Sequence, residues 1–516
     1  MTSSYLFVPM PPTPNGRMHV GHGGGTYLRS DVAARALRVR GASVAVVSGT
    51  DAFENWVLAE AKRIGRTPDE TCAIYHRGIA DDLAALGIEI DVWLDPRSPE
   101  HADRYRAVHE RALRALQATG AAVPVDERIP FSQTTGQELV GTWVAGGCPH
   151  CGADAGGSTC TRCGEHFQPE ELVDVRSRLD DSPVRWETRE HWFAVPTDAT
   201  ALRADLDASG MRSHVVEPAD RYLRSRGGRI RLTGQGTWGV RSPLAPADGV
   251  LANGYYLYAV YCGEVFAEAA AVSNPFVADT GVVTVGFFGS DNTTPGLVAP
   301  RVLAQGSGGT LRPFDRTVVN GMLAFEGQKC STSKRHGIWL GELLDGSGVT
   351  PDELRFCLAA MPLDEGVADL SLSVLVERTN RLRAWVADAL LPAVRESAGV
   401  AVRWDDTIAK ALDEQERELD LHRMDLPGAL GVVERWMDAP TLPTTAWLLG
   451  FALLAEPFLP VLARQVWEWL GHDGAPSTQE ARSRATRVRP GLAVPAVPAV
   501  PVTEASLAAF VHRAGG

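Results

Sequence analysis

Residues 4–25 of this 516-residue chain read SYLFVPMPPTPNGRMHVGHGGG, and they decide how the first part of the chain folds. The apolar run from Ser4 to Met10 predicts a short strand, and the proline-rich stretch after it predicts a loop. Apolar residues then recur at helical spacing from His22 to Gly41. A second apolar run, Ser43 to Val47, predicts another strand and leads to Asp51. Strand, loop, helix and strand make a βαβ unit, so we expect a nucleotide to bind where its strands end, near the helix N-terminus.

Two imidazoles, His19 and His22, stand three residues apart at the start of that helix. Glycines at positions 21 and 23–25 allow a flat base and a triphosphate to approach the backbone. The helix N-terminus and the imidazole donors then bind phosphate oxygens, more strongly as the α-phosphate becomes pentacoordinate. The alternative is a glycine-rich loop with incidental histidines. The position between a strand and a helix favours the phosphate site.

A second motif is Gly327-Gln-Lys-Cys-Ser-Thr-Ser-Lys-Arg335. The chain has 50 basic residues, and only four of them are lysines, yet Lys329 and Lys334 both fall in this motif. Lysines and hydroxyls in a mobile loop suit a clamp on departing pyrophosphate, because an ammonium is a compact charge. The alternative is a solvated basic turn, and the scarcity of lysine weighs against it.

Four of the eight cysteines form two pairs, Cys148-x-x-Cys151 and Cys160-x-x-Cys163. Two such pairs supply four thiolates in a tetrahedron, which predicts a structural Zn²⁺ with no position left for a catalytic water. We expect His150 and His166 to be exposed bystanders. Unpaired cysteines in this pattern also indicate a reducing compartment.

Composition excludes several classes of protein. Apolar residues make up 45% of the chain, which argues against wholesale disorder, and the net charge of −13 excludes a global basic field for nucleic acid. We find no secretory or transit signal at the N-terminus. The longest apolar stretch, Trp447 to Ala463, contains Glu456 and two prolines, so we expect a buried helix pair rather than a membrane span. We therefore expect a cytoplasmic protein.

The rest of the chain divides by its periodicity. Helical patterns run from Phe53 to Ile64 and from Pro99 to Thr119, and short strands fill about 120–245. The α/β pattern resumes at Tyr255 to Tyr261, where we expect a strand, and at Val282 to Phe288. The chain is then mostly helical over 351–470, followed by a stiff polyproline II connector over 490–502 and a short helix capped by Thr503.

The histidine and lysine motifs together resemble the two signatures of class I aminoacyl-tRNA synthetases, His-x-Gly-His and Lys-Met-Ser-Lys-Ser. Over residues 4 to about 390 the order of motifs resembles that of methionyl-tRNA synthetases. That order runs from the first strand through Asp51, the cysteine pairs, Glu171-Leu-Val173, Trp238-Gly239, Tyr256, Gly289-Ser-Asp291 and Asp352-Glu-Leu-Arg355 to Asn380. The resemblance implies a Rossmann-type α/β nucleotide-binding fold with an inserted zinc-knuckle domain and a C-terminal α-helical bundle. It also implies ATP-dependent activation of an amino acid to an adenylate, loss of pyrophosphate and transfer to tRNA.

The resemblance implies roles for individual residues. Catalytic contacts with the phosphates fall to His19, His22, Lys329 and Lys334. Binding of ATP, with Mg²⁺, falls to Gly21, Gly289, Asp291, Ser331 and Ser333, with Gly21 against the adenine and Asp291 on the ribose. Binding of the amino acid falls to Thr13, Asp51, Tyr258 and Tyr261. A carboxylate at Asp51 would pair with the substrate ammonium and so select amino acids over plain carboxylic acids.

We expect six regions along the chain. They are the first half of the catalytic domain (1–118), the inserted zinc-knuckle domain (119–230), the second half of the catalytic domain (231–325), the lysine-loop and stem-contact region (326–376), the helical bundle (377–472) and a Pro/Ala-rich tail (473–516).

The sequence departs from the family in the lysine motif and in the amino-acid pocket. Thr332 stands where the family has the second signature lysine, so we expect Lys334 to substitute, as in class I lysyl enzymes. In the amino-acid pocket, Gly296 stands near the family's histidine and Thr13 stands for a tyrosine. A thioether needs a snug apolar slot, so we expect a substrate other than methionine. Glu54 either binds a second polar group of the substrate or caps the helix that follows, and both interpretations stay open.

The helical region lacks the residues that the family uses for the anticodon, and we expect its tryptophans to be packing residues. These tryptophans are Trp385, Trp436, Trp447, Trp467 and Trp469. An arginine segment, Arg221 to Arg231, either contacts phosphates of an acceptor stem or pairs with carboxylates. The acceptor of the acyl group is therefore tRNA or a small molecule. The alternative function is a catalytically silent nucleotide- or tRNA-binding paralogue with a regulatory role. No residue pattern indicates the oligomeric state.

Overall fold

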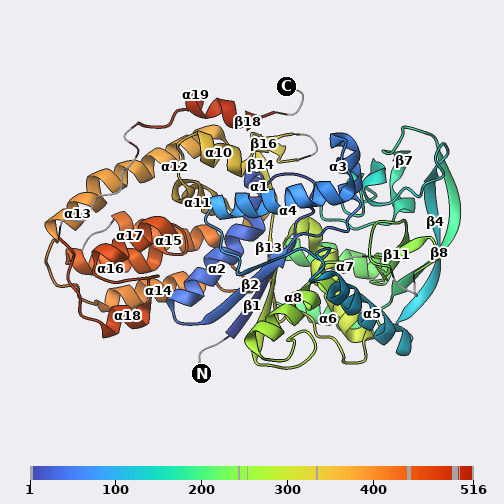
Figure 1. Cartoon of the computed structure of the whole chain (residues 1–516), viewed down its shortest axis with the longest axis horizontal. Coiled ribbons are helices and arrows are strands. Elements are labelled where there is room, and N and C mark those ends of the chain that lie inside the picture. Colours follow the sequence, from blue (N-terminus) through green and yellow to red (C-terminus); the bar gives the residue numbers. More distant parts are fainter. Residues whose placement is uncertain are drawn as a thin grey trace.

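A five-stranded parallel sheet lies at the centre of the computed structural model, which describes residues 4–241, 245–252, 254–332, 335–438, 443–490, 498 and 500–513 (Figure 1). Its strands, in spatial order, are β13 (Arg316–Asn320), β12 (Val282–Gly289), β1 (Ser4–Pro9), β2 (Ser43–Gly49) and β3 (Val92–Leu94). Tyr5 of β1 lies opposite Val44 on one side and Val283 on the other. The winding direction therefore reverses between β1 and β12, and such a switch point opens a crevice at the carboxyl ends of the strands.

Helices cover both faces of this sheet. They are α1 (Val20–His22), which continues through a π-helical turn (Gly23–Tyr27) into α2 (Leu28–Val39), then α3 (Trp56–Ile64), α4 (Pro68–Ala85), α5 (Ala102–Ala118), α8 (Tyr255–Ala270) and α9 (Ala299–Gly306). The expected βαβ unit is confirmed. Sequence analysis missed α4, although Thr67 and Glu70 form a capping box at its start with Pro68 as the first helical residue.

The expected strand at Tyr256 is wrong, because residues 255–270 form helix α8. The first nine residues of α8 are all buried, so its sequence is apolar on every side and shows no helical periodicity. A buried helix and a buried strand give the same apolar run, and length is the better guide. The 16 residues of α8 are too many for an ordinary strand.

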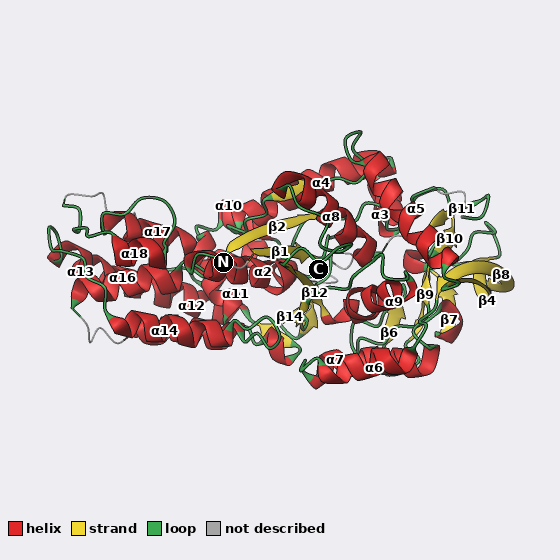
Figure 2. Cartoon of the chain, turned by 90° about the horizontal axis from the view of Figure 1, so that it is seen from below, coloured by secondary structure: helices red, strands yellow, loops and turns green. Residues whose placement is uncertain are grey.

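The inserted region forms small antiparallel sheets beyond the end of the central one (Figure 2). Its elements are the ribbon β4 (Ala122–Ser132) and β8 (Val184–Ala194) with β9 (Ile230–Arg231), the sheet of β5 (Val144–Gly147), β6 (Asp154–Gly156) and β7 (Val173–Ser177), and the pair β10 (Thr233–Gln235) and β11 (Gly249–Leu251). Two helices also lie here, α6 (Ala199–Ala208) and α7 (Ser213–Arg226). The sequence predicted only strands and turns in this region. The limits of the six regions stay a prediction.

The C-terminal part is helical, as predicted. Its helices are α10 (Leu340–Gly346), α11 (Pro351–Ala359), α12 (Leu372–Trp385), α13 (Leu391–Glu396), α14 (Asp406–Glu418), α15 (Leu426–Asp438), α16 (Thr444–Ala455), α17 (Pro460–Trp469), α18 (Thr478–Ser483) and α19 (Glu504–Leu507). The expected helix pair at 447–463 is α16 and α17, and within the described residues no helix is long and apolar enough to cross a membrane. Thr503 caps α19 as predicted. Most of the expected polyproline connector lies outside the described residues.

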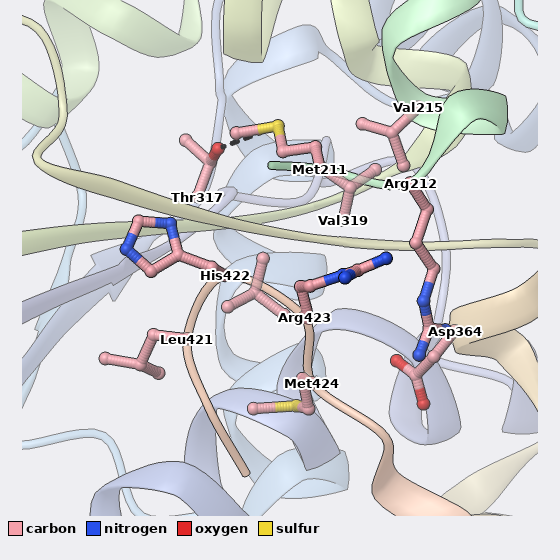
Figure 3. A pocket seen from close by; sticks show the side chains of 11 residues that line it. Met211, Arg212, Val215, Thr317, Val319, Asp364, Leu421, His422, Arg423 and Met424 are labelled. Atoms are coloured by element: carbon pink, nitrogen blue, oxygen red, sulfur yellow. Dashed lines mark hydrogen bonds between the residues drawn. The ribbon is translucent and has the colours of Figure 1, made fainter. Parts of the chain in front are cut away.

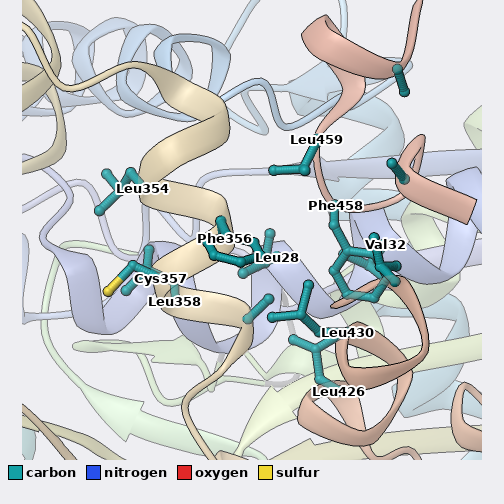
Figure 4. Close-up of a cluster of buried hydrophobic side chains, with 14 of the residues drawn as sticks. Leu28, Val32, Leu354, Phe356, Cys357, Leu358, Leu426, Leu430, Phe458 and Leu459 are labelled. Atoms are coloured by element: carbon teal, nitrogen blue, oxygen red, sulfur yellow. The ribbon is translucent and has the colours of Figure 1, made fainter. Parts of the chain in front are cut away.

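One continuous core joins the central sheet to the helical bundle. Leu28 of α2 lies beside Phe356 of α11, Val32 of α2 lies beside Phe458, and Leu426 and Leu430 of α15 complete the cluster (Figure 4). Within this core the fully buried Arg355 donates to Asp31 at 2.6 Å and to the backbone carbonyl of Pro457. A buried charge with this many partners fixes the bundle against the sheet, because a shift would leave it unpaired.

Candidate active site

One large cleft opens at the carboxyl ends of β1 and β12, with a cavity volume of about 710 Å³. That volume suits a nucleotide-sized ligand. Nine of the expected site residues line it: Thr13, His19, Gly21, His22, Asp51, Gly289, Asp291, Lys329 and Ser331. Two others, Ser333 and Lys334, lie outside the described residues.

The histidine pair stands at the mouth of α1. The two rings stack with centroids 3.7 Å apart. Nδ1 of His19 accepts the backbone N–H of Gly21 at 3.1 Å, and Nδ1 of His22 accepts the backbone N–H of His19 at 3.4 Å. Because both Nδ1 atoms accept hydrogen bonds, each neutral ring carries its proton on Nε2 and can donate it to a ligand.

Burial keeps both rings neutral. It lowers the pKa of His19 well below its usual range, and the neighbouring charges of His22 and Lys329 lower it further. Burial, with a smaller effect from Lys329, lowers the pKa of His22 to about 4, although Asp291 acts in the opposite direction. At neutral pH the cleft therefore presents two uncharged N–H donors.

Lys329 enters the cleft from a β-hairpin, and the mobility of the lysine motif stays a prediction. β14 (Leu323–Phe325) pairs with β15 (Gln328–Lys329), and the two residues between them, Glu326 (φ 48°) and Gly327 (φ 78°), are both left-handed. Two left-handed residues make the tight turn that suits the twist of a hairpin. The Nζ of Lys329 lies 3.7 Å from a carboxylate oxygen of Asp291, at the end of β12.

Two glycines allow the histidine and lysine motifs to meet. A Cβ atom at Gly16 would lie 2.2 Å from the Cγ2 of Thr332. A Cβ atom at Gly21 would lie 3.0 Å from the His19 ring and 3.2 Å from the Cβ of Cys330. Segments more than 300 residues apart in the sequence thus pack against each other at the cleft.

The other end of the cleft carries Asp51 and Glu54, from the turn between β2 and α3. Glu54 does not cap α3, because Asn55 is the N-cap residue and no side chain caps this helix. Burial raises the pKa of Glu54 to about 7, and its carboxylate makes no hydrogen bond or ion pair with any described residue. Burial also raises the pKa of the Tyr105 phenol, and the charges of Asp51 and Glu54 raise it further, so both carboxylates lie near Tyr105.

The two tyrosines expected in the amino-acid pocket do not line this cleft. Tyr258 is fully buried and donates to the backbone carbonyl of Leu94 at 3.2 Å. Tyr261 is also fully buried, and its hydroxyl has no hydrogen-bond partner among the described residues. Because α8 is a helix, the residues that face the cleft are instead Tyr255, Tyr256 and Leu257.

Sequence analysis also missed a wall of the cleft that comes from the inserted region. The wall includes Thr159, His166, Gln168, Tyr222 and Arg231. The expectation of an exposed His166 is wrong, since its Nδ1 lies 3.1 Å from the Thr159 hydroxyl, and burial with nearby arginines lowers its pKa to about 4. His150 is exposed as expected. No local signal places residue 166 in the wall of the cleft, because its position depends on the fold of the insertion.

The four cysteine sulfurs lie within 4.8 Å of one another, the arrangement that a metal ion needs. Sγ of Cys148 and Cys163 are 3.7 Å apart, and so are Sγ of Cys151 and Cys160. Four thiolates at Zn–S distances of about 2.3 Å in a tetrahedron stand about 3.8 Å apart, so the residues present fit zinc.

A comparison with known proteins agrees with this geometry. The family model for class I tRNA synthetases (M) matches residues 8–386. The chain belongs to this family. A methionine–tRNA ligase from Nocardioides sp. is 31% identical over 403 residues, covering 72% of this chain and 65% of the relative. A methionine–tRNA ligase from Cutibacterium acnes is 26% identical over 527 residues, covering 91% of this chain and 86% of the relative.

Solved structures of the family share the fold. A Mycobacterium tuberculosis methionyl-tRNA synthetase, in a crystal structure with bound methionyl-adenylate, superimposes with a TM-score of 0.66 over 95% of this chain and 99% of that one. The sequence identity is 16%, so this likeness concerns the fold alone. Several curated relatives extend beyond the match, and the matched stretch spans 65% and 64% of two of them.

The arginine segment of this synthetase-family chain is paired with carboxylates. Arg221 donates to Glu165 at 2.8 Å and Arg231 donates to Glu127 at 2.6 Å. Arg224 pairs with Asp220 and Arg226 with Glu171, while the Arg229 guanidinium lies over the Phe193 ring. The interpretation as carboxylate pairing is therefore favoured over a row of free phosphate ligands.

A second, smaller cavity lies between α7, β13 and the loop before α15 (Figure 3). Its volume is about 30 Å³, room for about one water molecule. Arg212 extends toward Asp364, whose oxygens already accept from Arg29 at 2.7 and 2.9 Å. This cavity marks the junction of the inserted region with the bundle, and we assign it no ligand.

Proposed function

We propose that this chain activates an amino acid with ATP, forming an aminoacyl-adenylate and releasing pyrophosphate, and then transfers the acyl group to tRNA or to a small-molecule acceptor. The observation that carries the proposal is the convergence of His19, His22 and Lys329 on one nucleotide-sized cleft at the switch point of the sheet. Family membership supports it, because the relatives are named as methionine–tRNA ligases.

In the proposed reaction a carboxylate oxygen of the amino acid attacks the α-phosphorus, and the bond to the bridging oxygen of pyrophosphate breaks. The Nε2–H groups of His19 and His22 donate to phosphate oxygens, and these hydrogen bonds strengthen as charge accumulates in the transition state. The ammonium of Lys329 neutralises charge on the departing pyrophosphate. Mg²⁺ would accompany the triphosphate.

The remaining assignments follow from the resemblance to the family. Asp291 at the end of β12 would bind the ribose, with Gly289 beside it, and Gly21 would lie against the adenine. Asp51 would pair with the substrate ammonium. Lys334 would supply the second ammonium that Thr332 lacks, and Ser331 and Ser333 would contact the phosphates.

We propose that the four cysteines hold a structural zinc ion. Their spacing fits, and with all four positions filled the ion would bind no substrate. It would fix the wall of the cleft that carries Thr159 and His166. All eight cysteines are free, which agrees with the reducing cytoplasm that we propose as the location.

We propose a substrate other than methionine, one whose side chain carries a cationic or hydrogen-bond-donating group. Glu54 supports this, because a largely desolvated carboxylate without a partner is costly until a hydrogen-bond donor or a cation binds it. Gly296 has no side chain to offer the substrate, and a Cβ atom at this position would lie 2.7 Å from the Phe288 ring.

Pyrophosphate exchange into ATP tests the proposal. We expect exchange with at least one amino acid bearing an amino, amide or hydroxyl side chain, and none with methionine. Exchange with methionine alone would reject the substrate proposal and keep the activity. Addition of total tRNA and isotope-labelled amino acid then separates transfer to RNA from a small-molecule acceptor.

A second candidate function is a catalytically silent paralogue that binds nucleotide or tRNA. The threonine at position 332 favours it, because the family has a lysine there. No exchange with any amino acid, together with tight ATP binding by calorimetry, would support the silent paralogue.

A further inference from the structure

A C-terminal segment runs along helix α12 of the bundle and contacts the hairpin that carries Lys329. Residues 500–513, which we call the strap, contain α19 and end in β18 (Val511–His512). Figure 1 shows α19 running beside α12 and β18 lying next to β16 (Gly337–Ile338). The strap is anchored to α12, where the Asn380 side chain bonds both the N–H and the carbonyl of Val502 and Arg383 donates to the Val500 carbonyl at 2.7 Å.

The strap contacts the turn of the lysine hairpin and the strand that follows the lysine motif. Arg513 donates two hydrogen bonds, of 2.7 and 3.0 Å, to the carboxylate of Glu326 in the hairpin turn. β18 pairs antiparallel with β16, the strand that follows the lysine motif, with Gly337 opposite His512. Glu326 has a left-handed backbone that a non-glycine residue adopts at a cost, so a fixed partner on its side chain stabilises this turn.

The strap also supports the histidine pair. Trp339 follows β16, and its ring makes a T-shaped contact with the His19 ring, with centroids 6.1 Å apart. The His512 ring makes a T-shaped contact with Trp339, with centroids 4.8 Å apart, and its Nε2 lies 2.7 Å from a carboxylate oxygen of Glu342. The strap therefore links α12 to two parts of the site. Arg513 contacts the hairpin that carries Lys329, and His512 contacts Trp339, which in turn contacts His19.

We propose that the strap is a positioning element of the catalytic centre: Arg513 and His512 hold the Lys329 hairpin and the Trp339–His19 contact in the arrangement that binds the triphosphate. It thereby couples α12 of the helical bundle to the nucleotide site. No residue of the strap lines the cleft, so the strap would act on the rate of activation and leave binding of the amino acid unchanged. This inference goes beyond the proposed function, but its kinetic readout rests on it.

Hydrogen–deuterium exchange of the full chain tests the contact without any activity. In Arg513→Ala we expect the amides of residues 323–331 to exchange at least about three-fold faster, because the turn loses its partner. Arg435→Ala is the matched control, since Arg435 also forms an exposed ion pair, with Glu414 at 2.7 Å in the bundle. Unchanged exchange over 323–339 in both Arg513→Ala and a His512→Ala, Arg513→Ala double variant would overturn the proposal.

Pyrophosphate exchange tests its consequence. We expect Arg513→Ala to lower kcat about five-fold with the KM of the amino acid unchanged, the size that one exposed ion pair supports. Arg513→Lys should recover most of the rate, and so should the charge swap of Glu326→Arg with Arg513→Glu. An unchanged kcat in Arg513→Ala, or a loss carried wholly by KM, contradicts the proposal. If the wild-type chain shows no pyrophosphate exchange, the proposed function fails. The hydrogen–deuterium exchange result still tests the Arg513–Glu326 contact.

Discussion

The two ends of the cleft differ in how closely they follow the family. At the nucleotide end, His19, His22 and Asp291 match the family motifs, and Lys329 reaches them from a hairpin with a firm turn. At the amino-acid end, Glu54 faces the cleft without a partner, and the expected tyrosines are buried against Tyr105 and do not line the cleft. Phosphate chemistry is the same for every substrate, whereas the side-chain pocket must differ for each one. A family member with a different substrate is therefore expected to keep the residues of the nucleotide end and to differ at the amino-acid end.

The largest effect should come from the nucleotide end. His19→Ala and His22→Ala each remove an N–H donor to the transition state, so we expect pyrophosphate exchange to fall about 10²- to 10³-fold. The control is His422→Ala, which removes an exposed histidine outside the cleft. A loss below about three-fold in both cleft variants would show that the histidines do not contact the reacting phosphates.

The lysine motif gives the next effect. Lys334→Ala should reduce exchange at least about 30-fold if this lysine replaces the one missing at Thr332, because it would supply charge to the leaving pyrophosphate. Lys410→Ala, in the helical bundle, should change the rate less than two-fold. Equal, small effects of the two variants would remove Lys334 from the mechanism.

The zinc knuckle connects to the amino-acid end, because a Cβ atom at Gly157 would lie 3.8 Å from the Trp56 ring. Cys151→Ser should abolish retention of about one zinc ion per chain, measured by mass spectrometry of the dialysed protein. We expect KM for the amino acid to rise about ten-fold and KM for ATP to change less, because the ion supports only one wall of the cleft. Full zinc retention by Cys151→Ser would contradict the four-cysteine site.

The smallest effect concerns pH. The pKa of Glu54 rises from 4.5 to about 7 on folding, so its carboxyl group costs no stability below pH 4.5, and it destabilises the folded chain increasingly as pH rises from 4.5 through 7. Glu54→Gln should therefore melt at a higher temperature than the wild type at pH 8, and the difference should close at pH 5. The same variant should raise KM for the favoured amino acid about ten-fold. Equal melting temperatures at pH 8 would mean that Glu54 already has a partner.

Local patterns in the sequence were enough to predict the main elements of the nucleotide end. The βαβ unit, the histidine pair and the cysteine pairs each depend on residues close together in the chain. The amino-acid end was harder, because the first nine residues of α8 are all buried and their sequence resembles that of a buried strand. His166 could not be placed either, since it reaches the cleft only through the fold of the insertion. The Arg513–Glu326 contact spans 187 residues, and no local pattern indicates it.

A crystal structure of the chain with a non-hydrolysable ATP analogue tests the central claim most directly. We predict that Nε2 of His19 and of His22 lie within about 3.2 Å of phosphate oxygens, with the Lys329 ammonium on the β- or γ-phosphate. A triphosphate bound away from both histidines, with Lys329 still paired to Asp291, would contradict the account.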